Sequence, residues 1–182
     1  MHERVKKLIE NNKLQEIKEK FAGKKVLLCG EGRNGKCDEN CADLLLKDKC
    51  GYHQRTEIQQ YLLRKCGIVC LLADDFIESS DTILDQEKAI IREEKFDAIM
   101  IFPNSPGSQI EFLDFAREQD FKGKLLLCIK EEFFPYGESD GVLTSKIKEY
   151  SLKGHCHLFR VKKDKDLREL SYEVLTDYFR YN

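Results

Sequence analysis

The sequence lacks a long hydrophobic run. Its longest apolar stretches are VLLC, IVCLLA, AIMIF and LLLCI, and each has the length of a strand rather than the ~20 residues that cross a bilayer. The first residues, MHERVKKLIENNKL, also lack the apolar centre and the small-residue cleavage site of a secretory signal. We therefore expect a soluble, cytoplasmic protein without a membrane partner.

An excess of one charge is missing as well. The chain has 31 Lys and Arg against 33 Asp and Glu, a formal charge of −2, and its basic residues are dispersed among acidic ones. This balance gives no general attraction to nucleic acid, so direct nucleic-acid binding is not expected. The stretch GEGRNG does not continue into Gly-Lys-Ser/Thr, which excludes a P-loop of the Walker type, and G-x-G alone is weak support for a dinucleotide site.

Strand-length apolar runs alternate along the chain with segments of helical periodicity. A chain of 182 residues fits one domain, and it contains no repeat, low-complexity tract or linker. Strands are expected within 24–32, 68–76, 96–103, 124–134 and 155–161, and helices within 55–67, 79–96, 108–119, 142–154 and 167–181. This alternation predicts an α/β fold, a three-layer Rossmann-like (flavodoxin-like) parallel sheet of about five strands with helices on both faces.

Two segments extend this plan. Residues 1–23 have the spacing of an amphipathic helix, which either caps the core or serves a homo-oligomer. The domain proper is expected at 24–182 and contains a Cys-rich polar insertion at 31–53. Four of the eight cysteines lie in or beside predicted core elements and are interpreted as reduced thiols: Cys29, Cys66, Cys70 and Cys128.

The insertion carries a candidate metal site. Cys37 and Cys41 are followed by Cys50 and His53, and three thiolates with one imidazole can form a closed tetrahedral zinc site. The spacing differs from the common zinc ribbons. A structural zinc and a plain helix with its cysteines turned inward both remain open at this point.

In parallel sheets of this kind, ligands bind beyond the carboxyl ends of the strands, near the point where the strand order reverses. This rule selects the loops after Cys29, Ala73 and Phe102, and Gly30, which opens the first loop, is a candidate substrate-binding residue.

The loop after Phe102 is the most informative of the three. Its sequence, FPNSPGSQIE, places Gly107 and the Ser108 amide at a helix start, where backbone can approach a phosphate or hydroxyl. Glu111 follows one turn later and can point to the same cleft. Alternatively, Ser108 and Glu111 form an S-x-x-E capping box with no further role.

The order of several segments resembles the nucleoside 2-deoxyribosyltransferase-like group, which is broadly related to TIR-type and SLOG-type nucleotide domains. The likeness is closest to effector proteins of bacterial retron antiphage systems. It covers roughly residues 24–130 and rests on VLLCGEG, on Arg55 opening RTEIQQYLLRK, on LLADDF, on Glu87 within LDQEKAII and on NSPGSQIEFLDFA.

The resemblance implies an N-glycosidase or ribosyl transferase that acts on NAD, a nucleoside or a nucleotide, needs no cofactor for catalysis and serves antiphage defence with an oligomeric or defence-system partner. Glu111 is the implied catalytic residue, which acts at the anomeric carbon. The resemblance also implies residues that hold the sugar or its phosphate, and acids that accept hydrogen bonds from hydroxyls or the base: Asn104, Ser105, Gly107 and Ser108 for the first group, and Asp74 or Asp75 for the second.

Some positions have a simpler interpretation. Asp74 and Asp75 also fit a solvated strand end, and Arg55 and Glu87 also fit ion pairs on helix surfaces. Relatives commonly continue E-L-G-x-F, whereas this chain has a bulky Phe112-Leu113 pair after Glu111. The difference predicts a site that is narrower or differently hydrated than in an active relative. The alternative function is therefore a sensor domain of the same fold that binds a nucleotide without cleaving it.

Overall fold

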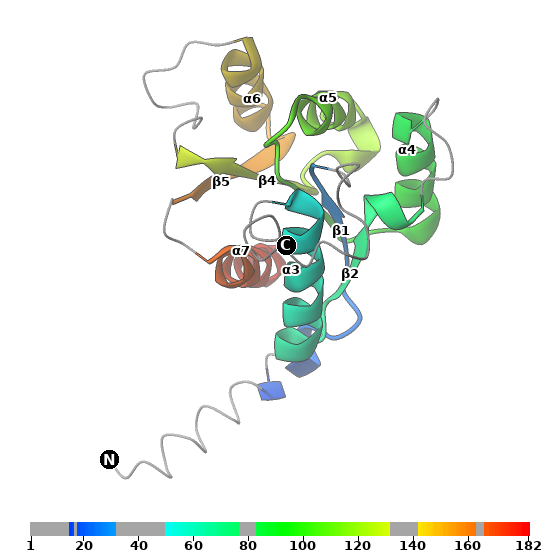
Figure 1. The fold of residues 1–182 in the computed structure, drawn as a ribbon, viewed down its shortest axis with the longest axis vertical. Coiled ribbons are helices and arrows are strands. Elements are labelled where there is room, and N and C mark those ends of the chain that lie inside the picture. The colour runs from blue at the N-terminus through cyan, green and yellow to red at the C-terminus, as the bar shows by residue number, and fades with distance from the viewer. Residues whose placement is uncertain (1–14, 17, 32–49, 77–82, 132–141, 163–165) are drawn as a thin grey trace.

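The computed structural model describes residues 15–16, 18–31, 50–76, 83–131, 142–162 and 166–182. Five strands and five longer helices alternate along these residues (Figure 1). The strands are β1 (Lys25–Cys29), β2 (Val69–Leu72), β3 (Ala98–Ile101), β4 (Leu125–Lys130) and β5 (Cys156–Val161). The helices are α3 (Gly51–Cys66), α4 (Ile83–Glu94), α5 (Pro106–Phe115), α6 (Val142–Leu152) and α7 (Leu167–Tyr181), with short 3-10 turns η1 (Ala73–Asp75) and η3 (Gln119–Phe121).

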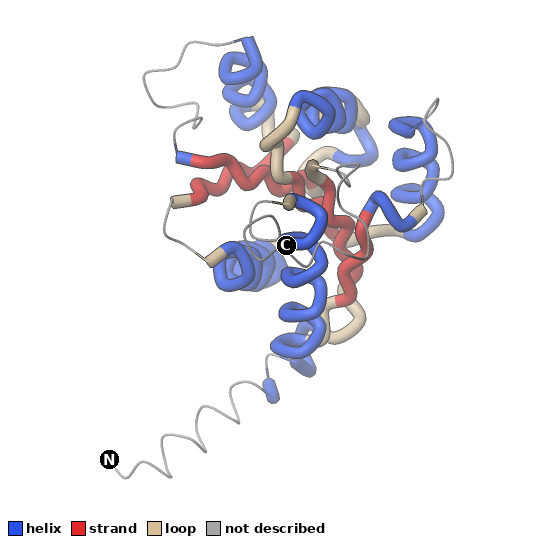
Figure 2. The backbone as a smooth tube through the Cα atoms, in the orientation of Figure 1, coloured by secondary structure: helices blue, strands red, loops and turns tan. Residues whose placement is uncertain are grey.

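All five strands form one parallel sheet in the order β2-β1-β3-β4-β5. The chain leaves β1 for the edge strand β2 and then returns to the other side of β1 with β3, so the strand order reverses between β1 and β3. This is the predicted flavodoxin-like architecture, and the expected fold class is confirmed. Figure 2 shows the strands as one layer with helices on either side.

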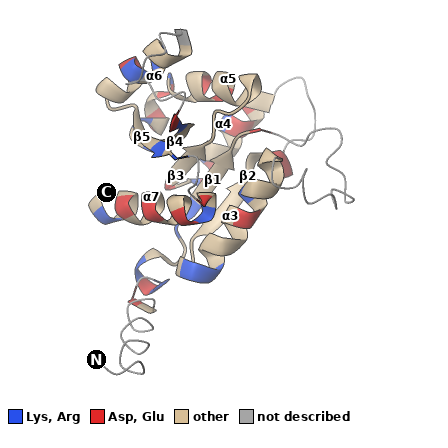
Figure 3. Ribbon diagram, turned by 60° about the vertical axis from the view of Figure 1, so that its left-hand side comes forward, with Lys and Arg blue, Asp and Glu red and all other residues tan. Residues whose placement is uncertain are grey.

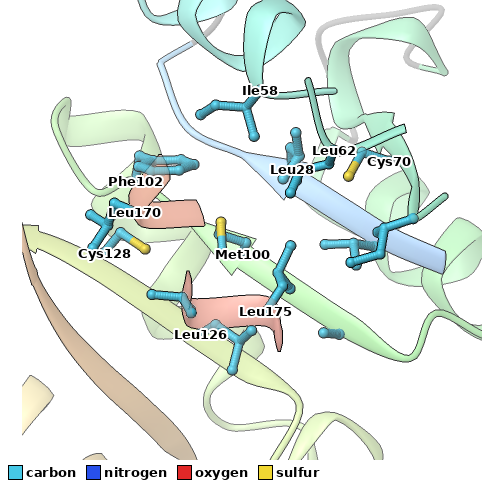
Figure 4. Packing of buried hydrophobic residues seen from close by; sticks show 14 of the residues in the cluster. Leu28, Ile58, Leu62, Cys70, Met100, Phe102, Leu126, Cys128, Leu170 and Leu175 are labelled. Carbon is cyan, nitrogen blue, oxygen red and sulfur yellow. The ribbon is translucent and has the colours of Figure 1, made fainter. Parts of the chain in front are cut away.

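Helices cover both faces of the sheet because its strands are apolar in both directions. The residues of β3 are all buried, as expected for a strand enclosed between two layers. On one face α3 and α7 pack against the sheet, and on the other α4, α5 and α6 do so. Figure 4 shows the first of these cores, in which side chains of α3 and α7 pack against those of the strands. The helices contribute Ile58, Leu62, Leu170 and Leu175, and the strands contribute Leu28, Cys70, Met100, Leu126 and Cys128.

The predicted helices are present, with shifted starts. The helix expected from Arg55 begins at Gly51, so the last residues of the predicted insertion 31–53 belong to α3. The helix expected from Ser108 begins two residues earlier, at Pro106. Proline suits the first helical position because an N–H at that position has no acceptor within the helix, so nothing is lost by its absence. Of the predicted leading helix, residues 15–16 and 18–21 are described and helical, and Phe21 is buried in the core.

The cysteines of the described core are reduced, as predicted. Cys29, Cys66, Cys70 and Cys128 are all buried and form no disulfide. Burial raises the pKa of the Cys128 thiol to about 12, which keeps it protonated and unreactive at neutral pH.

Acidic residues lie along the middle of α7, where Glu169, Glu173 and Asp177 recur every four residues, and basic residues lie near its ends (Figure 3). On α3 the basic residues Arg64 and Lys65 lie in the last turn. Within the described part of the chain, no helix combines the length and apolar character needed to span a membrane.

Candidate functional site

A cavity of about 360 Å³ lies beyond the carboxyl ends of β1 and β2, next to the point where the strand order reverses. The loop after β1, the end of β2 and helices α3, α4 and α5 all contribute to its wall. Its lining residues are Gly30, Arg55, Ala73, Asp74, Ile83, Leu84, Glu87, Ser105, Gly107, Ser108, Ile110 and Glu111. The site therefore lies where the rule for parallel sheets predicted it.

Arg55 is a buried residue of the cavity and not a helix-surface residue. Its side chain is 2% exposed, and Nη2 lies 2.8 Å from Oδ2 of Asp74. The same guanidinium donates to three backbone carbonyls, those of Leu28 at 3.1 Å, Glu31 at 2.6 Å and Gly51 at 3.4 Å. The alternative of a surface ion pair is wrong for Arg55, because the side chain ties the ends of β1 and β2 to the start of α3.

Gly30 lies close to the end of the third strand. A Cβ atom at this position would lie 3.3 Å from the carbonyl oxygen of Phe102, a tight contact, and 3.5 Å from Cδ of Arg55, an ordinary one. Gly30 lines the cavity as predicted, and its lack of a side chain allows the loop after β1 to lie close to the Phe102 carbonyl.

Two carboxyl groups from different helices meet on the cavity wall. Glu111 of α5 is 7% exposed and Glu87 of α4 is 3% exposed, and their side chains hydrogen-bond to each other. In each of them the Oε2 atom is buried and has no hydrogen-bond partner among the described residues. Glu87 is thus also a cavity residue, contrary to the alternative of a surface ion pair.

The pair holds a proton at neutral pH. Burial is the main cause that raises the pKa of Glu87, to about 7, and the Asp74 carboxylate raises it further. Burial likewise raises the pKa of Glu111 well above its ordinary value, and the neighbouring Glu87 adds to this. Two carboxyls in contact cannot both ionise easily, so near pH 7 one acid and one carboxylate lie side by side.

Cys29 lies beside this pair but is not a nucleophile. Its thiol is wholly buried, and burial together with the negative charges of Glu111 and Glu87 raises its pKa well above the ordinary value. A thiol that stays protonated is a poor nucleophile. The reactive groups of the cavity are therefore its carboxyls.

The acid pair makes folding stability depend on pH. The folded protein binds the Glu87 proton with a pKa of about 7, whereas a glutamate ordinarily titrates near 4.5. The stability associated with this group is therefore complete below pH 4.5 and is lost as the pH rises through 7, by about 3 kcal/mol. We expect Glu87→Gln to unfold like the wild type at pH 5 and to be more stable than the wild type at pH 8, by urea denaturation.

The control for this comparison is Glu94→Gln on the same helix, because Glu94 is a half-exposed residue paired with Lys25. Its effect should be small at both pH values. If Glu87→Gln is no more stable than the wild type at pH 8, the folded protein does not raise the pKa of Glu87.

Ion pairs fasten the two helices that carry the acid pair. Lys88 of α4 lies 2.7 Å from Asp114 of α5 and 3.4 Å from Glu118, and Arg92 of α4 lies 2.7 Å from Glu118 and from Asp120. We call these residues the α4–α5 clasp. The clasp connects α4 to the end of α5 and to the residues that follow it.

Ser105 and Ser108 cap α5 and leave Glu111 uninvolved. Ser105 is the N-cap residue, and its Oγ accepts a hydrogen bond from the Ser108 amide at 3.3 Å. In return the Ser108 Oγ accepts one from the Ser105 amide at 3.0 Å. The predicted capping box of Ser108 with Glu111 is therefore wrong, because the helix starts earlier and Glu111 lies beyond its first turn. Its carboxyl is available to the cavity.

Two of the predicted binding residues lie elsewhere. Asp75 is an exposed residue of the 3-10 turn after β2 and is not among the residues that line the cavity, unlike its neighbour Asp74. Asn104 is exposed and borders a separate, much smaller cavity of about 10 Å³ beneath Arg55. The structure thus brings together Gly30, Asp74, Ser105, Gly107, Ser108 and Glu111 from the predicted set.

The bulky pair after Glu111 does not line the cavity. Phe112 is fully buried in the core under α5, and its ring packs edge-on against Tyr150 of α6, with 6.2 Å between ring centroids. Leu113 is partly buried and packs against the same core. Neither side chain is among those that line the cavity, so these two residues do not narrow it in the described structure.

The predicted zinc site lies largely outside the described residues, because Cys37 and Cys41 do. Cys50 is buried directly before α3, and His53 lies in its first turn with its ring against Tyr52. Among the residues that the structure describes, no three His, Cys, Asp or Glu side chains group as metal ligands. A structural zinc in this segment stays a prediction.

The sequence pattern drew attention to Arg55 and Glu87 but did not predict that they are buried in the site. Their spacing relative to the apolar residues of the same helices could have indicated it. Glu87 lies between Ile83 and Ile91 at intervals of four, in the middle of the face of α4 that meets the core and cavity. Arg55 continues the buried stripe Ile58, Leu62 and Cys66 of α3 in the same way. A charge within an apolar stripe is a sign of a buried, partnered group.

Comparison with known proteins adds no assignment: no protein-family model matches the chain, and no curated protein matches it significantly.

Proposed function

We propose that this chain cleaves the N-glycosidic bond of NAD, a nucleoside or a nucleotide, by hydrolysis or by transfer of the ribosyl or deoxyribosyl group. One observation carries the proposal: the contact between Glu87 and Glu111, each with a buried oxygen that lacks a partner in the described structure, on the wall of a ligand-sized cavity. Paired carboxyls in two protonation states are the usual equipment for breaking glycosidic bonds.

The roles follow from the shared proton. The carboxylate of the pair stabilises positive charge at the anomeric carbon or attacks it, while the bond from that carbon to the base nitrogen breaks. The bond's electron pair stays on the base, which takes up the proton of the carboxylic acid. By the resemblance, Glu111 acts at the anomeric carbon. In the resting pair burial raises both pKa values, and the shared hydrogen bond raises the pKa of Glu111 further and lowers that of Glu87, so Glu111 carries the proton. The proton therefore passes to Glu87 across this hydrogen bond, and Glu87 gives it to the leaving base. A water molecule then attacks the anomeric carbon and returns a proton to Glu87, or an acceptor base takes the place of the water.

A role in antiphage defence is part of the proposal and rests on the resemblance to retron effector proteins alone. Cleavage of a cellular N-glycoside depletes a nucleotide pool, which fits a toxic effector.

The purified protein, incubated with NAD and a panel of nucleosides and nucleotides, is expected to release free base or nicotinamide. Products are resolved by mass spectrometry, beside a Glu111→Gln sample that shows the uncatalysed background. Recovery of every compound intact while one of them stabilises the protein against heat would favour the alternative, a binding domain without cleavage. If no compound is cleaved or bound, the glycosidase proposal fails.

A further inference from the structure

The charged groups of the cavity do not suit a phosphate. Three carboxyls line it, those of Asp74, Glu87 and Glu111, and Arg55 is the one cation among its described lining residues. The Arg55 guanidinium already contacts Asp74 and three backbone carbonyls on its Nε and both Nη atoms. A phosphate entering this space would meet carboxylates and an arginine whose charge Asp74 offsets.

The start of α5 offers little to a phosphate either. Helix starts bind anions through amides of the first turn. Here Pro106 has no N–H, the Ser108 amide donates to Ser105 Oγ, and the Gln109 amide donates to the Ser105 carbonyl at 3.1 Å. Only the Gly107 amide remains among the first four positions. The helix that the sequence offered as a phosphate site is capped by its own serines.

Three aliphatic side chains also line the cavity. They are Ile83 and Leu84 of α4 and Ile110 of α5, and Ile110 is 56% exposed. They belong to the same two helices as the acid pair. The cavity thus has an acidic part for groups that donate hydrogen bonds and an apolar part for a flat, weakly hydrated group.

The size of the cavity points in the same direction. About 360 Å³ lies at the small end of the range for ligand pockets, roughly 300–1,000 Å³. This volume suits one sugar with one base better than a dinucleotide.

We propose, on the basis of the N-glycosidase function above, that the Arg55–Asp74 pair and the capped start of α5 exclude phosphate, so that the ligand is a nucleoside whose sugar carries no phosphate. Its hydroxyls face the carboxyls, and its base lies against Ile83 and Ile110. Asp74 sets this specificity because its carboxylate forms an ion pair with the Arg55 guanidinium, which is then not available to a phosphate.

The test is equilibrium binding of matched pairs by calorimetry at pH 7: adenosine, guanosine, cytidine and thymidine, each beside its 5′-monophosphate. At least one nucleoside is expected to bind at least about tenfold more tightly than its monophosphate. A monophosphate that binds as tightly as its nucleoside, or the absence of nucleoside binding up to about 1 mM, overturns the inference.

Two variants locate the effect. Asp74→Asn should reduce the discrimination against monophosphate, because the amide leaves the Arg55 charge uncompensated. Ile110→Ala should weaken nucleoside binding about fivefold. The matched control is Leu63→Ala, since Leu63 is 54% exposed on α3 and is not a cavity residue. Unchanged discrimination in Asp74→Asn would refute the assigned role of Asp74.

The outcomes separate this inference from the proposed function. A nucleoside that binds selectively and is recovered intact leaves the inference standing and contradicts the glycosidase. A monophosphate that binds more tightly than its nucleoside and loses its base contradicts the inference and supports the glycosidase.

Discussion

Glu111→Gln is expected to lower the rate of base release by at least about a thousandfold while the protein stays folded. Glutamine has nearly the same shape as glutamate, so the packing of α5 is preserved. It can neither attack the anomeric carbon nor carry the charge that stabilises it. Glu111 is buried beside Glu87, so its ionised form is unfavourable in the folded protein. The substitution removes this ionisable group, and thermal stability at pH 8 should therefore rise.

The measurement is single-turnover base release, with circular dichroism and thermal unfolding on the same preparation. Glu94→Gln serves as the control, because Glu94 is half-exposed, pairs with Lys25 and lies outside both the cavity and the α4–α5 clasp. Its rate should stay within about threefold of the wild type. A Glu111→Gln variant that retains a tenth or more of the activity would show that another group acts at the anomeric carbon.

Arg55→Met is expected to destabilise the protein by about 3–5 kcal/mol. The substitution keeps much of the side-chain volume but removes the guanidinium. The carboxylate of Asp74 loses its cation, and the carbonyls of Leu28 and Glu31 lose the hydrogen bonds that the guanidinium donates. Urea denaturation measures the loss. Arg64→Met on the same helix is the control, since Arg64 is exposed and should change stability by less than about 0.5 kcal/mol.

The double variant Arg55→Met with Asp74→Asn tests the cause. If the unpaired carboxylate is responsible, removing its charge should restore a substantial part of the lost stability. If the double variant loses as much stability as the two single variants together, the effect comes from the backbone carbonyls instead.

The fold could be predicted from the sequence because the residue pattern within each segment indicates whether it is a strand or a helix. The fully apolar runs of β1, β3 and β4 and the helical spacing between them leave few arrangements other than a parallel sheet covered on both faces. The strand-order rule then placed the cavity correctly, and FPNSPGSQIE supplied Glu111, Ser105, Gly107 and Ser108.

The pairing of side chains from distant segments could not be predicted in this way. Arg55 and Asp74 are nineteen positions apart, and Glu87 and Glu111 twenty-four, so neither contact has a local signature. The helix start was misplaced for a different reason. Ser105 and Ser108 both suit an N-cap, and the choice fell to Ser105 because Pro106 then occupies the first helical position.

The α4–α5 clasp gives the site a sensitivity to its surroundings. The Glu87–Glu111 contact exists only while α4 and α5 stay together, and the clasp that holds them consists of partly exposed charges. Salt screens such charges, whereas it hardly reaches the buried acid pair. We therefore expect a higher ionic strength to weaken the clasp and, through the spacing of the helices, to change how firmly the two carboxyls retain their common proton. The acidity of the site is set at the surface of the molecule as well as in its interior.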